Sequence, residues 1–172
     1  MQTAKSLSYD DGGDAVDLLR RQHREIDRLL GALVEAPAAR KGGLLAEVGD
    51  LLAIHLAVEE RVFYPGLTPD GDGRSFVVLT VEDHFDIKRA LAALLELDPG
   101  ARGLDARASL LRERLRAHTA AEERLYPRIR RRIGRARLRR LEYEMRVLEF
   151  EIRTDAEPRR LVVEDGAITA SA

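Results

Sequence analysis

Two near copies of one short motif constrain this chain more than any other feature of its sequence. Each copy reads His-x-x-x-Glu-Glu-Arg and closes with Tyr-Pro; the first spans residues 55–65 and the second, one residue shorter, spans residues 118–127. Residues four apart on an α-helix lie on the same face, about 6 Å apart along the axis. A nitrogen ligand and an oxygen ligand therefore point the same way in each copy: His55 with Glu59, and His118 with Glu122.

The duplication extends beyond these two motifs. The segment from His23 to Leu33 aligns without gaps on the segment from His84 to Leu94, with a shared His, an acid two positions later, and shared Ile, Arg and Leu positions. We therefore expect two repeated helix pairs related by a pseudo-two-fold axis. The chain has four histidines in all, and this arrangement places one on each of four helices.

Apolar residues recur with a helical period in four segments, which predicts an all-α fold. The expected helices run from Asp14 to about Pro37, from between Ala38 and Leu44 to Pro65, from Ser75 to Leu97, and from Asp105 through Pro127, where a bend is expected. Residues 66–73 are dense in turn formers and are expected to be a loop. Four amphipathic helices with short connections are typical of an up-down-up-down four-helix bundle.

The composition changes after Pro127. Eight arginines fall between positions 128 and 140, followed by an apolar stripe that predicts an additional C-terminal helix over about residues 136–153. This helix is expected to pack on the bundle or on a second copy of the chain. We expect a flexible arm over residues 1–13, one domain over residues 14–153 comprising the bundle and this helix, and a mobile tail over residues 154–172.

Bulk composition excludes several classes of protein. A length of 172 residues suits one domain, and 45% hydrophobic with 5% aromatic residues favours helices over sheet. The net charge of −1 disfavours nucleic-acid binding, and the arginine run is expected to be a solvated face. The absence of cysteine excludes disulfides, thiolate zinc sites and iron–sulfur clusters. With neither a signal peptide nor a membrane-spanning stretch in the sequence, we expect a cytoplasmic protein.

Ionisable side chains on the apolar faces of these helices are expected to meet inside the bundle. Buried imidazoles and carboxylates without partners are costly, and a pair of divalent or trivalent cations would neutralise them. Nitrogen and oxygen donors without thiolate suit iron or manganese, and zinc is also compatible. Both glutamates can bridge two cations. The predicted metal ligands are His23, His55, Glu59, His84, His118 and Glu122.

Other interpretations of these residues fit less well. Each histidine on its own could be an ordinary helix residue with a hydrogen-bond partner, but four at repeat-related positions favour a shared site. The Glu-x-x-His spacing of ferritin-like diiron proteins is missing, because Arg20, Leu52, Val81 and Leu115 stand three positions before the histidines. No serine-bearing elbow or cysteine supports a hydrolase, and no catalytic residue is assigned.

The order of these residues, with Tyr-Pro closing the second and fourth helices, resembles the haemerythrin-like, or HHE cation-binding, domain. The resemblance covers about residues 14–133. It implies a non-haem diiron centre with an oxo or hydroxo bridge. The expected ligands of such a centre are small molecules such as dioxygen, hydrogen peroxide or nitric oxide.

One position departs from the oxygen-carrying members of that family. They place a second histidine one turn after the histidine of the third helix, where this chain has Lys88. More coordination positions would then be open, which favours redox turnover, peroxide decomposition first, over reversible oxygen carriage. Tyr64 is a candidate extra ligand, and Asp27, one turn after His23, is a spare carboxylate.

The same features allow a function without turnover. The alternative is an iron- or oxygen-sensing interaction module in which metal binding orders the bundle and the C-terminal helix presents a partner surface or a homodimer contact.

Overall fold

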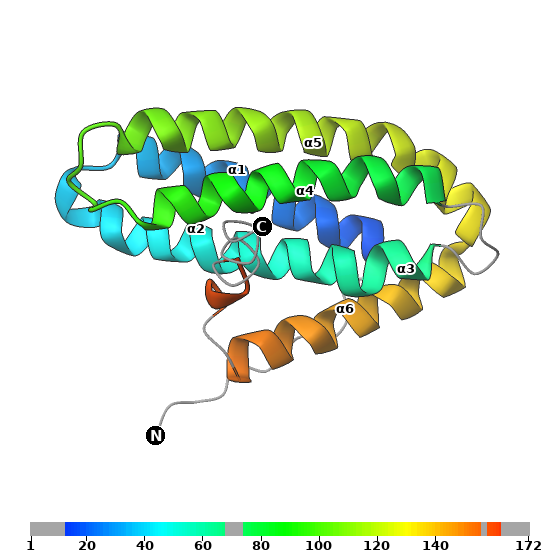
Figure 1. Ribbon diagram of the computed structural model, residues 1–172. Coiled ribbons are helices and arrows are strands. Elements are labelled where there is room, and N and C mark those ends of the chain that lie inside the picture. Colours follow the sequence, from blue (N-terminus) through cyan, green and yellow to red (C-terminus); the bar gives the residue numbers. More distant parts are fainter. Residues whose placement is uncertain (1–12, 68–73, 156–157, 163–172) are drawn as a thin grey trace, which may run out of the picture.

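The computed structural model describes residues 13–67, 74–155 and 158–162, with the backbone alone at residues 74–82 and 155. Helices α1, α2, α4 and α5 lie side by side as a bundle, and α6 crosses beneath its α3 end (Figure 1). The prediction of an all-helical bundle with an additional C-terminal helix is confirmed. The elements are α1 (Ala15–Glu35), α2 (Ala38–Val58), η1 (Glu59–Phe63), α3 (Tyr64–Gly66), α4 (Arg74–Leu95), α5 (Leu104–Ile133) and α6 (Arg135–Asp155).

The helix ends follow local chemistry. Asp14 caps α1 by accepting hydrogen bonds from the N–H groups of Val16 and Asp17, and the Asp17 carboxylate accepts in return from the N–H of Asp14. Glycines with positive φ precede α5 and separate it from α6: Gly103 (97°) and Gly134 (78°). Helix α5 runs unbroken through Pro127, and its C-terminal part turns towards α6 (Figure 1). Most of the predicted loop, residues 68–73, lies outside the described residues.

A π-helical turn, η1, absorbs the residue by which the two motif copies differ in length. The N–H of Tyr64 donates to the carbonyl of Glu59, five residues earlier, whereas an α-helix bonds residues four apart. Tyr64 therefore follows Glu59 by one helical turn, as Tyr126 follows Glu122 on α5. The sequence predicted one regular helix to Pro65; the helix is continuous there but widened at η1.

Two apolar clusters fill the bundle, and the predicted ligand layer lies between them. Along α1, residues 15–19 belong to one cluster and residues 26–33 to the other, with His23 between the two. On α5 the order is reversed: Leu111 and Leu115 precede His118, and Tyr126 and Ile129 follow it. The ionisable side chains are thus enclosed by apolar packing on both sides.

Helix α6 packs on the end of the bundle that holds η1 and α3. Leu138, Leu141 and Met145 are buried in the same cluster as Phe63. The contact with α3 is so close that a Cβ on Gly66 would overlap the side chain of Leu141. Helix α6 is therefore in direct contact with both η1 and α3.

Part of the expected C-terminal tail, residues 158–162, contacts the bundle. Val162 is buried in the cluster at the opposite end of the bundle from α6, and Arg159 pairs with Asp50 of α2 at 2.8 Å. Leu161 packs against the cluster on the side of α6, so two apolar side chains and an ion pair connect residues 158–162 to the bundle. The remainder of that tail, and residues 1–12 of the expected N-terminal arm, lie outside the described residues.

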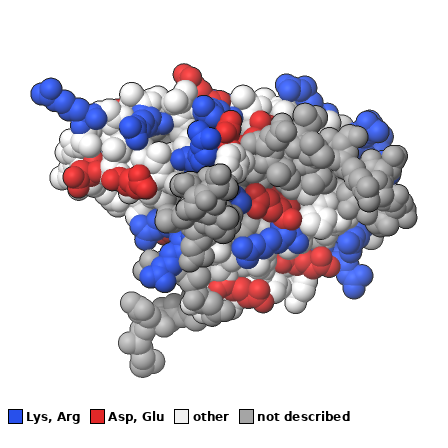
Figure 2. All heavy atoms as spheres, in the orientation of Figure 1, with Lys and Arg blue, Asp and Glu red and all other residues white. Residues whose placement is uncertain are grey.

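Acidic and basic side chains are interspersed on the face of the molecule shown in Figure 2. Arginines of α6 pair with glutamates of the same helix, as in Arg146 with Glu142 and Arg153 with Glu149. Within the described residues, no helix is both long and apolar enough to cross a lipid bilayer.

Candidate metal centre

The predicted ligand side chains meet in the middle of the bundle. His23 comes from α1, His55 from α2, His84 from α4, and His118 with Glu122 from α5. Glu59 is the first residue of η1, directly after α2. All six are buried, with exposed fractions between 0% for His55 and Glu59 and 9% for His23.

The histidines form two pairs that match the sequence repeat. The ring centroids of His23 and His55 are 4.8 Å apart, and those of His84 and His118 are 4.9 Å apart. Within the second pair, the two Nε2 atoms approach to 3.3 Å. The near-equal spacings are what two repeated helix pairs would produce.

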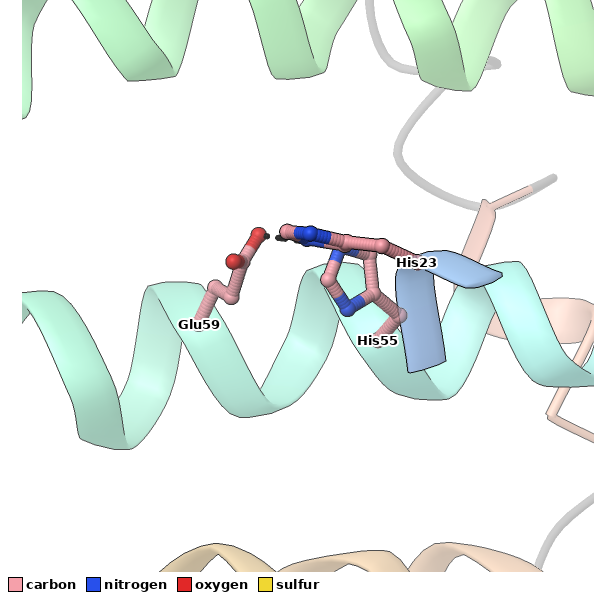
Figure 3. Close-up of side chains that lie close together, drawn as sticks. All are labelled: His23, His55 and Glu59. Carbon is pink, nitrogen blue, oxygen red and sulfur yellow. Dashed lines mark ion pairs between the residues drawn. The ribbon is translucent and has the colours of Figure 1, made fainter. Parts of the chain in front are cut away.

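Each carboxylate contacts histidines of both pairs. Oε2 of Glu59 lies 3.4 Å from Nε2 of His55 and 3.2 Å from Nε2 of His84. Oε2 of Glu122 lies 3.2 Å from Nε2 of His23 and 3.5 Å from Nε2 of His118. Figure 3 shows the Glu59 carboxylate beside the rings of His23 and His55. Both glutamates therefore lie between the two histidine pairs.

The spacing of these atoms fits a shared cation better than direct hydrogen bonding. Two ligands about 2.1 Å from one cation, at right or tetrahedral angles, are about 3.0–3.4 Å apart. Three of the four contacts, at 3.2–3.4 Å, lie within that range, and the fourth, at 3.5 Å, lies just above it. Nε2 of His55 and both carboxylate oxygens of Glu59 are buried without a hydrogen-bond partner among the described residues. Among these residues, two groups could hold a cation: His23 with His55 and Glu59, and His84 with His118 and Glu59.

The pKa values of the buried histidines differ widely. Burial lowers the pKa of His55 to about 3, so this imidazole is neutral. Burial acts the same way on His84, but its contacts with Glu59 and Glu60 prevail and raise its pKa to about 9. Burial and the nearby Glu59 charge raise the pKa of Glu122, whereas the histidines hold the pKa of Glu59 low against the effect of burial. A protonated His84 thus places a positive charge beside the Glu59 and Glu60 carboxylates.

Two of the outer ring nitrogens face polar side chains that sequence reasoning missed. Nδ1 of His55 donates to Oε1 of Gln22 at 3.0 Å, and Nδ1 of His118 faces Oδ2 of Asp83 at 3.6 Å. Gln22 and Asp83 stand directly before the repeated histidines of α1 and α4, so the alignment of the repeats held a signal for them. Such partners orient imidazoles that bind a metal.

Glu60 and Glu123, the second glutamates of the two motif copies, have different partners. Oε1 of Glu60 accepts from Nδ1 of His84 at 3.0 Å, and its Oε2 accepts from Nζ of Lys88 at 2.8 Å. Glu123, the equivalent residue, pairs instead with Arg20 at 2.6 Å. These are contacts outside the ligand layer, as the helical spacing predicts. Lys88 therefore does not point into the centre as a substitute ligand; it neutralises the carboxylate behind His84.

Two tyrosines close the centre on the side of α6. The hydroxyl of Tyr64 donates to Oε1 of Glu122 at 2.7 Å, and its oxygen lies 3.4 Å from Nε2 of His84. The hydroxyl of Tyr126 donates to the other oxygen of Glu122 at 3.3 Å. Burial and the two carboxylates raise the pKa of Tyr64, which keeps it a phenol in the protein without a cation. Asp27, the other spare candidate, turns away and pairs with Arg112 and Arg116 of α5.

Comparison with known proteins agrees with this geometry. Residues 14–110 match the family model described as "Hemerythrin HHE cation binding domain". A solved structure from Mycobacterium kansasii, entitled a hemerythrin HHE cation binding domain-containing protein and Rv2633c homolog, aligns with a TM-score of 0.72 and 23% sequence identity. The alignment covers 89% of this chain and 99% of that one, and it shows the same fold. No protein with a curated description matches.

Proposed function

We propose, from the premise that this chain belongs to the hemerythrin HHE cation-binding family, that it holds two iron ions between its histidine pairs. His23 and His55 would hold one ion, His84 and His118 the other, and Glu59 and Glu122 would bridge them. The observation that carries the proposal is the contact of each buried carboxylate with histidines of both pairs. The donor set of imidazole and carboxylate suits iron, and manganese and zinc are also compatible.

The protein surroundings suit a reaction with a small oxidant. A pair of iron ions would supply one- or two-electron exchange with hydrogen peroxide, dioxygen or nitric oxide. The two apolar clusters keep bulk water from the metal-ligand layer. The hydroxyl oxygen of Tyr64, which carries a proton, lies 2.7 Å from Oε1 of Glu122. With Lys88 in place of a further histidine, the chain supplies fewer nitrogen ligands than an oxygen carrier would. We therefore place hydrogen peroxide first among the substrates, in the balanced reaction of two peroxides to two waters and one dioxygen.

Elemental analysis of the purified protein tests the metal content. We expect close to two iron ions per chain, a charge-transfer absorption band in the oxidised protein, and evolution of dioxygen on addition of hydrogen peroxide. A chain purified and reconstituted under iron-replete conditions that binds no transition metal would refute the centre itself. Full iron occupancy without dioxygen evolution would refute peroxide decomposition alone.

A second candidate, metal sensing without turnover, is favoured by the contact between α6 and the metal-site turn. Glu59 begins η1, and α6 packs directly on η1 and α3 through Leu141. A cation that draws Glu59 into place would also set the wide turn on which α6 rests. Val147 and Phe150 are exposed on α6, at 39% and 58%, and are available to a partner or to a second copy in a homodimer.

Chelation distinguishes the two candidates. A sensor should lose helical signal around α6 or change its oligomeric state when the metal is removed, and it should evolve no dioxygen from peroxide. Circular dichroism and light scattering before and after chelation measure both properties. An oligomeric state and helical content that are the same with and without metal would refute sensing.

A further inference from the structure

A small cavity lies between α1 and α5, at the edge of the metal-ligand layer. Its volume is about 20 Å³, room for about one water-sized molecule. It is lined by His23, Ile26, Asp27, Leu115, Arg116 and Thr119. Ile26 and Leu115 belong to the apolar core, Arg116 is exposed, and His23 is a predicted ligand. The cavity is therefore bordered both by an exposed side chain of the α1–α5 seam and by a side chain of the ligand layer.

His23 is the ligand histidine at which such a path would arrive. It is the most exposed of the four, at 9%, whereas the exposed fractions of the other three lie between 0% and 3%. Its Nδ1, like that of His118, has no hydrogen-bond partner among the described residues, whereas Nδ1 of His55 and His84 are both bonded. Tyr64, at 2% exposure, covers the centre near His84. The His23 side of the layer is thus the more accessible one within the described chain.

An ion-pair cluster forms the outer end of this cavity. The Asp27 carboxylate binds the guanidinium of Arg112 at 2.8 and 2.9 Å and that of Arg116 at 2.6 and 3.0 Å. Arg112 lies flat over Gly31, where a Cβ would come within 2.9 Å of its nitrogens. Two guanidiniums on one carboxylate leave a net positive charge. Thr119, one turn after Arg116, is held by a hydrogen bond from its hydroxyl to the carbonyl of Arg116.

We propose that this seam is the entry port for small molecules to the metal centre, and that Asp27, Arg116 and Thr119 gate it. This rests on the proposed function. The small volume of the cavity restricts the path to small molecules, and the net positive charge at its mouth favours anions and neutral molecules over cations. Hydrogen peroxide, nitric oxide and small anions such as azide fit both conditions.

Association rates of two probes test the port on the iron-loaded full chain. Azide is the anionic probe and nitric oxide the neutral one, each followed by stopped-flow absorption. Thr119→Leu narrows the port, so we expect association and dissociation of both probes to slow by about tenfold or more, with little change in affinity. Ala120→Leu adds a side chain of the same size at the neighbouring exposed position and should leave both rates unchanged.

The charge of the mouth is tested separately. Arg116→Met should lower the azide association rate by about two- to fivefold and reduce its dependence on ionic strength, without slowing nitric oxide. Arg114→Met is the matched control, because Arg114 lies on the same helix but faces Asp86 of α4. If Arg116→Met and Arg114→Met change the azide association rate equally, the proposed selection by charge is wrong.

A further measurement does not depend on ligand binding. Deuterium exchange at the Cε1–H of each histidine, measured by mass spectrometry on the protein as purified, reports access of water to that ring. We expect His23 to exchange fastest, faster still in Thr119→Ala and more slowly in Thr119→Leu. Normal iron content with identical probe rates in Thr119→Leu and Ala120→Leu would overturn the port and leave the metal centre standing. A chain without iron and without azide binding would instead overturn the proposed function.

Discussion

Replacing Glu59 with glutamine is the change that tests the centre most directly. Gln has nearly the same volume, so packing is kept, but the amide removes the negative charge and one strong ligand. Glu59 is fully buried and belongs to both groups of potential ligands. A loss at this residue should therefore weaken both cation positions together.

The expected loss of metal affinity in Glu59→Gln follows from the number of ligands at each cation position. Cation binding at four-ligand structural sites is worth about 10–16 kcal/mol, or roughly 3 kcal/mol for each ligand. Loss of one ligand at each position should lower each affinity by about 100-fold. At a free iron concentration that just saturates the unmodified chain, we expect the metal-to-chain ratio of Glu59→Gln to fall from near two to well below one. The helical content should persist, because Leu52, Val58 and Phe63 keep the apolar clusters on both sides of the layer.

Glu60→Gln is the matched control, since it makes the same chemical change one residue later. Glu60 contacts the outer nitrogen of His84 and lies at no bridging position, so its loss should weaken one position by about 10- to 100-fold. Metal content by elemental analysis and affinity by chelator competition compare the two variants. Two tightly bound ions in Glu59→Gln, or equal losses in both variants, would show that Glu59 is not a bridging ligand.

Four other outcomes are expected. Because His84 has a pKa of about 9 without metal, a cation must displace its proton, and apparent affinity should fall about tenfold for each pH unit below 9 in chelator competition. The folding stability of the metal-free protein should depend on pH in the opposite direction. The raised pKa of His84 stabilises the fold fully below pH 6.5, and that stabilisation is lost as the pH rises through 9. Gly66→Ala should lower the free energy of unfolding by about 1–3 kcal/mol, measured by urea denaturation, because its Cβ overlaps Leu141. Tyr64→Phe should destabilise by about 1–2 kcal/mol, because Glu122 loses a buried donor at 2.7 Å.

Three of these outcomes have a control or a contrary result. A chelator-competition slope of zero between pH 7 and 9 would show that His84 is not protonated before binding. Gly43→Ala is the control for Gly66→Ala, since nothing lies within 4 Å of its Cβ; there we expect stabilisation by about 0.5–1 kcal/mol. Tyr126→Phe should cost less than Tyr64→Phe, because its bond to Glu122 is longer, at 3.3 Å. Equal costs would contradict that ranking.

Local contacts across one helical turn were readable from the sequence. His55 with Glu59 and His118 with Glu122 approach to 3.4 and 3.5 Å because the helix itself brings residues four apart together. The repeat of the motif placed one histidine on each of α1, α2, α4 and α5. Whether these six side chains bind iron remains a prediction, but their convergence needed only helical periodicity and a common core.

Contacts between helices were decided by the tertiary structure. Glu60 meets His84, and Lys88 meets Glu60, only because the rotation and register of α4 against the bundle bring them together. The sequence showed Lys88 as a missing ligand but not that it pairs with a carboxylate behind a ligand. Likewise Asp27 stands one turn from His23, yet two arginines of α5 draw it to the surface.

The inserted residue at η1 shows the same division. The sequence by itself determined that the two motif copies differ in length, and that His, Glu and Tyr recur in order in both. It did not determine that a π-turn would absorb the extra residue and bring the Tyr64 hydroxyl to Glu122, on another helix. Periodicity along one helix follows from backbone geometry alone. The choice of partner across helices depends on how whole helices pack, and the sequence pattern of any one helix does not contain that information.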